Sequence, residues 1–238
     1  MVMTVCKKLA QLAALGTVVL CVLQISSVRA AEFQEGQQYA RLAVPVETLD
    51  PNKVEVVEVF SYACIHCKNF DPALEEWRAA QPDDVLFRRV PAIFNQTWAL
   101  FAQAFYTAEL LDITDKIHGP MFAAIHDEGV DLRDPTLLAE LFNKAAGVPN
   151  AEFTQVFNSF GVRSRVQQAD AHGRAYGITG VPTLIVDGRF RVDGTMAGNN
   201  TNMLKIVDFL VEKQRAAHAD TGAIDARVPL PPTDLITE

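Results

Sequence analysis

Two cysteines separated by two residues are the part of the sequence most able to do chemistry. Cys64 and Cys67 enclose Ile65 and His66 in a Cys-Ile-His-Cys motif. Such a pair can ligate a metal ion, close a structural disulfide or act as a reactive dithiol. The surrounding sequence bears on which of these three roles the pair has.

Zinc binding and a structural disulfide are the two weaker alternatives. Zinc needs three or four ligands, and Cys64, His66 and Cys67 supply at most three from one short segment. The other histidines show no metal-ligand spacing: His118, His126, His172 and His218. A disulfide that closes a four-residue loop stabilises a protein by only about 2 kcal/mol. We therefore favour a reactive dithiol, and expect no metal and no cofactor besides the Cys64–Cys67 disulfide.

A reactive dithiol fits the place of the motif in the chain. The β-branched and aromatic residues of Val54–Phe60 predict a strand, so Cys64 would begin the helix that follows. The N-terminus of a helix stabilises an anion and lowers the pKa of a thiol there. His66 can add a positive or hydrogen-bonding partner, and Cys67 would be shielded one turn further on. Because a stabilised thiolate favours the reduced form, the pattern indicates an oxidant.

The elements around the motif begin with an arm, a strand, a helix and a second strand. Residues 31–53 are polar and predict an arm with an edge strand near Tyr39–Val44. Apolar residues at spacings of four and three predict the helix after the motif: Phe70, Leu74 and Trp77. We expect Pro72 to kink this helix, because proline lacks the backbone donor. Val85–Val90 predicts the second strand.

A long helical segment follows. Over residues 97–176 apolar side chains recur at helical spacing. Within it, Asp134-Pro135 is typical of a helix start and Gly147 of a helix end. We expect a block of several helices here, inserted between two parts of a sheet.

The chain then returns to the sheet through a predicted hairpin. Val181–Val186 and Arg189–Val192 flank Asp187-Gly188, a pair that suits a tight turn. Asn199-Asn200-Thr201 supplies capping residues for a last helix. One face of that helix is apolar: Met203, Val207, Leu210 and Val211. The whole order predicts one α/β sheet interrupted by a helical insertion.

The first thirty residues predict export from the cell. Lys7 and Lys8 precede an apolar run over residues 9–25, and a cleavage site follows near Ala30. Removing residues 1–30 removes three positive charges and no negative one, so the net charge changes from −8 to −11. Of the four cysteines of the 238-residue chain, only Cys64 and Cys67 then remain. A charge of this sign argues against nucleic acid as a partner.

Three separate segments together resemble a known family. Glu58–Cys67 (Glu-Val-Phe-Ser-Tyr-Ala-Cys-Ile-His-Cys), Gly180-Val181-Pro182-Thr183 and Gly188-Arg189-Phe190 are similar to the DsbA family of thiol:disulfide interchange proteins of the bacterial periplasm. The resemblance implies an α/β thioredoxin fold with an inserted all-helical domain. We therefore expect a discontinuous thioredoxin-like domain (31–96 and 177–215) and a helical domain (97–176), between the signal peptide (1–30) and a flexible C-terminal tail (216–238) that its alanine, aspartate and proline residues predict.

The resemblance implies catalytic roles for four residues. Cys64 is the solvent-facing cysteine that is attacked, and Cys67 is the resolving one. His66 corresponds to the histidine that steadies the thiolate of Cys64. Glu58 corresponds to a buried acid beneath Cys67 that helps to move protons during exchange.

Four further residues are expected to bind the substrate. Val181 and Pro182 correspond to the segment whose cis-proline lies against the disulfide and pairs with substrate backbone, and Thr183 follows them. Ile65 lies between the cysteines, where the family commonly has proline. Because isoleucine keeps a backbone N–H and an apolar side chain, this position bears on the strength of the oxidant.

The expected function is that of a monomeric, periplasmic oxidase that donates its disulfide to reduced, newly exported proteins. The family implies reoxidation by a membrane-embedded, quinone-linked partner of the DsbB type. One alternative is a disulfide reductase or isomerase of the same fold. Such isomerases usually carry an N-terminal dimerisation domain, for which residues 31–53 leave no room. An alternative of another class is a non-catalytic periplasmic chaperone that binds peptides.

Overall fold

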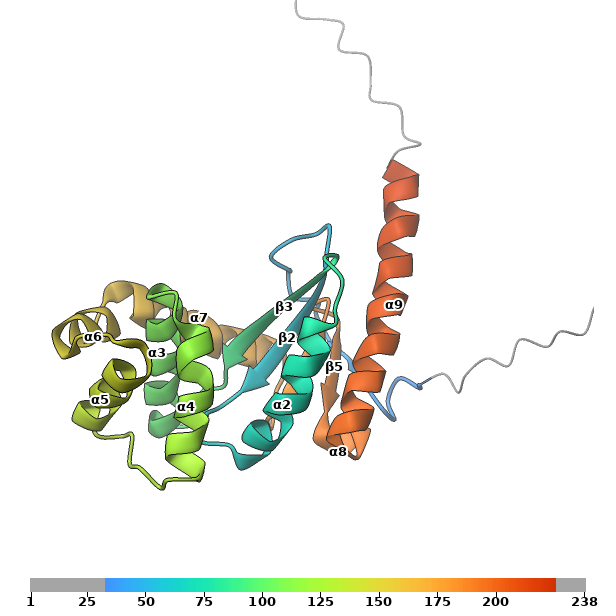
Figure 1. Ribbon diagram of the computed structural model, residues 1–238. Helices are drawn as coiled ribbons and strands as arrows, with labels where there is room; N and C mark the ends of the chain where they lie inside the picture. Colours follow the sequence, from blue (N-terminus) through green and yellow to red (C-terminus); the bar gives the residue numbers. More distant parts are fainter. Residues whose placement is uncertain (1–32, 226–238) are drawn as a thin grey trace, which may run out of the picture. The chain divides into compact units, whose positions relative to one another are not determined.

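A five-stranded mixed sheet is the centre of the structure, a computed structural model that describes residues 33–225, with side chains as far as residue 219. Its strands lie in the order β1-β5-β4-β2-β3 (Figure 1). Their bounds are Ala40–Arg41 (β1), Val54–Phe60 (β2), Val85–Pro91 (β3), Thr183–Val186 (β4) and Phe190–Asp193 (β5). The predicted strands are all present, although β1 is shorter than the expected Tyr39–Val44.

The strand β2 is buried along its whole length. It pairs in parallel with β3 and antiparallel with β4. Its two glutamates, Glu55 and Glu58, are as buried as its valines. A buried carboxylate needs a cation, and β3 supplies one for each. Arg88 Nε lies 3.0 Å from Glu55 Oε2, and Arg89 Nε lies 2.7 Å from Glu58 Oε2.

Two helices cover one face of the sheet. These are α2 (Ile65–Ala79) and α9 (Asn200–Asp225), which lie side by side in Figure 1. Both predicted apolar stripes are buried there: Phe70, Leu74 and Trp77 of α2, and Met203, Val207, Leu210 and Val211 of α9. Trp77 Nε1 donates a hydrogen bond to Asp208 Oδ1 at 2.6 Å, which ties the helices together. This face positions α2, and with it the cysteine motif.

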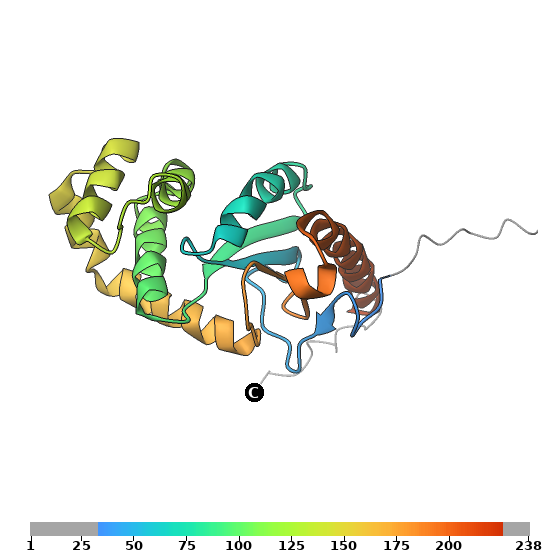
Figure 2. The same cartoon turned by 90° about the horizontal axis from the view of Figure 1, so that it is seen from below.

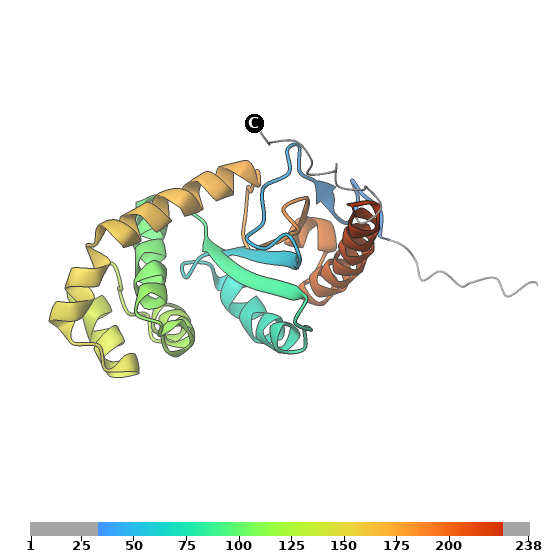
Figure 3. The same cartoon turned by 90° about the horizontal axis from the view of Figure 1, so that it is seen from above.

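Five helices form the block between β3 and β4: α3 (Gln96–Leu110), α4 (Thr114–His126), α5 (Pro135–Ala146), α6 (Asn150–Phe157) and α7 (Phe160–Ala175). The ends of α5 were predicted correctly. Asp134 caps it by accepting from the N–H of Thr136, and Gly147 ends it in the left-handed region at φ 74°. Figures 2 and 3 show the block beside β3, with α7 running back from it to the sheet.

The hairpin of β4 and β5 turns at Asp187 and Gly188, whose φ angles of 54° and 58° are those of the tight turn predicted for this pair. The N-terminal arm crosses the turn, and Val46 N donates to Gly188 O at 2.8 Å. A Cβ atom on Gly188 would lie 1.9 Å from Val46 O. Only glycine therefore fits both the turn and the close approach. The short helix α8 (Gly194–Ala197) follows β5.

The last helix is longer than the sequence indicated. α9 continues to Asp225, beyond residue 215, where a tail was expected to begin. Alanines favour the helix in this segment, and His218 Nε2 lies 3.0 Å from Asp187 Oδ2 of the hairpin. The predicted signal peptide (1–30) and the end of the predicted tail (226–238) lie outside the described residues. Over residues 33–225, no helix has the length and apolar character needed to cross a membrane.

Candidate active site

Cys64 lies at the N-terminus of α2, as predicted. It is the N-cap residue, and its main chain is extended, with φ −98° and ψ 114°. A tight turn leads into it: Cys64 N donates to Ser61 O at 3.0 Å, and Ala63 N donates to Ser61 Oγ at 3.2 Å. The strand β2 ends at Phe60, directly before this turn. The sheet, the turn and α2 together fix where the sulfur lies.

The surroundings of Cys64 favour its thiolate. A hydrogen bond from the Cys67 side chain is the largest cause, and the backbone N–H groups of Cys67 and His66 and the charge of His66 add to it. These effects outweigh partial burial and lower the pKa of Cys64 from 9.0 to about 6. Both cysteines are free in this structure. A thiolate at neutral pH is the attacking or leaving species of thiol–disulfide exchange.

Cys67 and Glu58 are both buried, and the charge of Glu58 acts on the Cys67 thiol. Cys67 is 0% exposed and Glu58 is 1% exposed. Burial raises the pKa of the Cys67 thiol well above its usual value, and the charge of Glu58 raises it further. Burial also raises the pKa of Glu58 to about 7, against the attraction of Arg89. A carboxyl group that titrates near neutrality beside a thiol that resists ionisation can exchange a proton with it.

Arg89 is the centre of a buried polar network around Glu58. Besides Glu58, its guanidinium contacts Asp71 at 3.0 Å and Glu75, both on α2. Asp71 Oδ1 also lies 3.0 Å from His118 Nε2 of α4. Sequence reasoning missed this network. The available signal was the pair of arginines in β3, because each could face an acid of the neighbouring strand; no local pattern marks His118.

The segment around Pro182 lies against the cysteines. The Val181–Pro182 peptide bond is cis. Cys64 Sγ lies 3.5 Å from Val181 O, within reach of a sulfur hydrogen bond. Pro182 and Thr183 are buried and Val181 is half-buried, and Thr183 Oγ1 donates to Gly180 O at 2.8 Å. Of the expected substrate-binding residues, Val181 thus contacts Cys64, and Pro182 lines a cavity together with His66, whereas Thr183 follows them as the first residue of β4.

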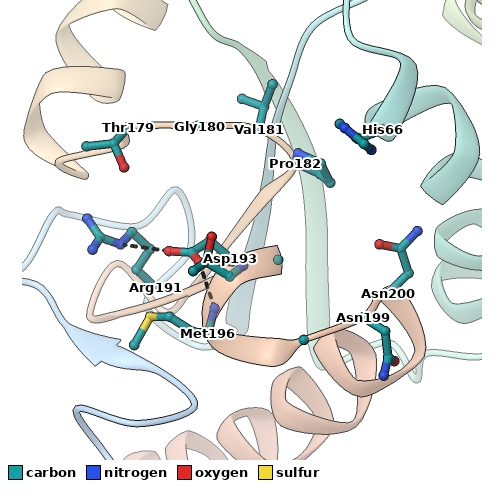
Figure 4. Close-up of a pocket in the computed structure, with 13 residues that line it drawn as sticks. His66, Thr179, Gly180, Val181, Pro182, Arg191, Asp193, Met196, Asn199 and Asn200 are labelled. Carbon is teal, nitrogen blue, oxygen red and sulfur yellow. Dashed lines mark hydrogen bonds and ion pairs between the residues drawn. The ribbon is translucent and has the colours of Figure 1, made fainter.

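A cavity of about 670 Å³ opens beside the motif. Figure 4 shows His66 and the segment from Thr179 to Pro182 along one side of it, and polar side chains on the other; the latter are Arg191, Asp193, Asn199 and Asn200. The fourth expected residue, Ile65, is 43% exposed but does not line this cavity. Among the side chains of residues 33–219, no three of His, Cys, Asp or Glu are grouped so as to hold a metal ion.

The comparisons with known proteins all indicate the same kind of protein. A model of the DSBA-like thioredoxin domain matches residues 55–204. The thiol:disulfide interchange protein DsbA of Azotobacter vinelandii is 39% identical over 194 residues, which are 82% of this chain and 90% of that protein. The protein of the same name from Pseudomonas aeruginosa is 38% identical over 189 residues, 79% and 89% of the two chains. A crystal structure of Pseudomonas aeruginosa DsbA matches with a TM-score of 0.76 at 37% identity, covering 80% of this chain and 98% of that one.

Proposed function

Since the chain belongs to the DsbA family of thioredoxin-fold thiol:disulfide oxidoreductases, we propose that it oxidises the cysteine pairs of newly exported proteins in the bacterial periplasm. The contrast between the two thiols carries the proposal. Cys64 is partly exposed with a lowered pKa, whereas Cys67 is fully buried with a raised one. A dithiol whose thiolate is stabilised gives its disulfide away readily. The Cys64–Cys67 disulfide is the group that becomes reduced when the substrate is oxidised.

The reaction proceeds through a mixed disulfide. A substrate thiolate attacks Cys64 Sγ, the Cys64–Cys67 bond breaks, and its electron pair goes to Cys67 Sγ. A second substrate thiolate then attacks the substrate sulfur, and Cys64 leaves as a thiolate. The substrate loses two electrons in forming its disulfide, and the pair Cys64 and Cys67 gains them.

Glu58 supplies the proton that Cys67 needs in the first step. A buried thiolate at Cys67 is costly, because burial opposes its charge. Glu58, with a pKa of about 7, holds a proton in about half of the molecules at neutral pH. His66 stabilises the leaving thiolate of Cys64 through its backbone N–H and its charge.

Extended peptide binds beside the motif through main-chain contacts. The segment Val181–Thr183, whose Val181 carbonyl lies against Cys64 Sγ, supports this role, with Ile65 as an exposed apolar contact. Backbone pairing tolerates many substrate sequences. Each turnover leaves the pair reduced, so an oxidant must restore it. We assign this step to a membrane-embedded, quinone-linked partner of the DsbB type, as the family implies.

Two variants test the proposal. We expect Cys64→Ala to abolish the oxidation of a reduced model peptide, because no sulfur remains to be attacked. We expect Cys67→Ala to lose turnover as well. When this variant is incubated with a disulfide-bonded peptide, its Cys64 thiolate should attack the peptide disulfide, release one peptide thiolate and accumulate a mixed disulfide, which mass spectrometry detects. Full activity of Cys64→Ala would contradict the proposal and favour a chaperone. If the protein reduces disulfides but does not form them in glutathione buffers, the reductase or isomerase alternative is correct.

A further inference from the structure

One face of α4 holds the turn that leads into Cys64. His118, Phe122 and His126 are spaced four residues apart, and all three contact Tyr62. The Tyr62 hydroxyl lies 3.0 Å from His118 Nδ1. The ring of Phe122 packs edge-on against the Tyr62 ring, with centroids 5.1 Å apart. His126 Nε2 lies 2.8 Å from the main-chain oxygen of Tyr62.

Tyr62 is the second residue of the four-residue turn that delivers the active-site sulfur. The turn begins at Ser61, whose oxygen accepts from Cys64 N. Both the side chain and the carbonyl group of Tyr62 are held by α4, which lies about 60 residues further along the chain. A shift of this turn moves Cys64 relative to the N–H groups that stabilise its thiolate.

The protonation states of the buried groups determine which atom donates and which accepts in each hydrogen bond. Burial lowers the pKa of His118 and raises that of Tyr62, so both are neutral near pH 7. Burial opposes the ionisation of Asp71, but hydrogen bonding to His118 and the charge of Arg89 lower its pKa overall. His118 therefore donates from Nε2 to the Asp71 carboxylate, and its Nδ1 accepts from the Tyr62 hydroxyl.

A second contact joins the end of α4 to the first turn of α2. Asp127, directly after His126, forms an ion pair with Lys68, directly after Cys67. The two elements that carry Cys64, the turn and α2, are thus both attached to the same end of α4.

From these contacts we propose that His118 and His126 are positioning residues for the exchange reaction, which hold Tyr62 so that Cys64 sits at the N-terminus of α2 with its thiolate stabilised. This inference rests on the proposed role of Cys64 as the attacked sulfur. The helical insertion then contributes to the exchange reaction indirectly. None of these contacts joins α4 to a cysteine, and α4 influences the position of the Cys64 sulfur through Tyr62.

The test compares His126→Leu with His126→Gln. Leucine removes the donor to the Tyr62 carbonyl, whereas the glutamine Nε2 keeps a donor at similar reach. We measure the pKa of Cys64 in the reduced protein from the pH dependence of its alkylation. In His126→Leu we expect the pKa to rise by at least about half a unit, so that about twofold less thiolate remains near pH 6. In His126→Gln the pKa of Cys64 should return most of the way to the wild-type value. His172→Leu, on α7, should leave that pKa unchanged.

Tyr62→Phe provides an independent variant that keeps the buried ring. It removes only the hydroxyl that His118 holds, and the pKa of Cys64 should again rise. A purely structural role predicts that each variant destabilises the reduced and oxidised proteins equally and leaves the pKa of Cys64 unchanged, which would overturn the inference. A wild-type Cys64 pKa near 9 would instead overturn the proposed function, so the two failures are distinguishable.

Discussion

Replacing Glu58 with glutamine removes the charge and the proton of the carboxyl group beside Cys67 while it keeps the size of the side chain. Glu58 is 1% exposed, and its Oε2 lies 2.7 Å from Arg89 Nε. Arg89 keeps Asp71 and Glu75 as partners in the variant. The change therefore isolates the titration of this one buried acid.

The size of the effect follows from the shift of the Glu58 pKa. Burial raises it from 4.5 to about 7, which corresponds to about 3 kcal/mol. A pKa that is raised in the folded state contributes stability below the unfolded value, and this stability is lost as the pH rises through the folded value. Relative to Glu58→Gln, the wild type should thus lose about 3 kcal/mol of unfolding free energy between pH 4 and pH 8.

Chemical denaturation of the two oxidised proteins at several pH values measures this difference. Glu55→Gln is the matched control, since it removes the other buried carboxylate of β2, which pairs with Arg88 on the opposite face from Glu58. We also expect Glu58→Gln to slow peptide oxidation by a factor on the order of 10², because Cys67 loses its proton donor. The reasoning is wrong if the stability difference between wild type and Glu58→Gln is the same at pH 4 and pH 8.

Two further predictions concern a turn and the thiolate. We expect Gly188→Ala to destabilise the protein by about 2 kcal/mol or more, because the new Cβ would lie 1.9 Å from a main-chain oxygen. Thermal unfolding measures this, and Gly119→Ala, in open space on α4, should not destabilise; equal melting temperatures would refute the argument. We expect His66→Ala to raise the pKa of Cys64 by only about 0.3 units, because the charge of His66 is the smallest of its named causes. Alkylation at several pH values measures this pKa, and a lower pKa of Cys64 in the variant would contradict the role given to His66.

Local patterns were sufficient for the elements and for the cysteine motif. The Asp-Pro start and glycine end of α5 and the Asp-Gly turn of the hairpin depend on backbone preferences of the residues themselves. The same holds for Cys64, because a motif directly after a strand falls at the start of the next helix. The burial of Glu58, by contrast, was inferred from the family resemblance and could not be read from the strand, since both faces of β2 are covered.

Contacts between distant elements could not be predicted. Arg89 meets Glu58 because β3 pairs with β2 in a register that only the folded sheet defines. The sequence shows only that His118 and His126 lack metal-ligand spacing, and nothing in that spacing points to Tyr62, more than fifty residues earlier. The extent of α9 was also underestimated, because a segment rich in alanine, aspartate and proline was read as a tail.

The most direct test of the account is the difference in unfolding free energy between the reduced and the oxidised protein as a function of pH. The pKa of Cys64, lowered from 9.0 to about 6, stabilises only the reduced form, increasingly as the pH rises from 6 to 9. At pH 8 this amounts to at most about 3 kcal/mol, because partial exposure screens the charge, against about 2 kcal/mol for the cross-link in the oxidised form. We predict that the reduced protein is the more stable at pH 8 and that its advantage grows from pH 6 upward. A clearly more stable oxidised protein, or a difference independent of pH, would contradict the account.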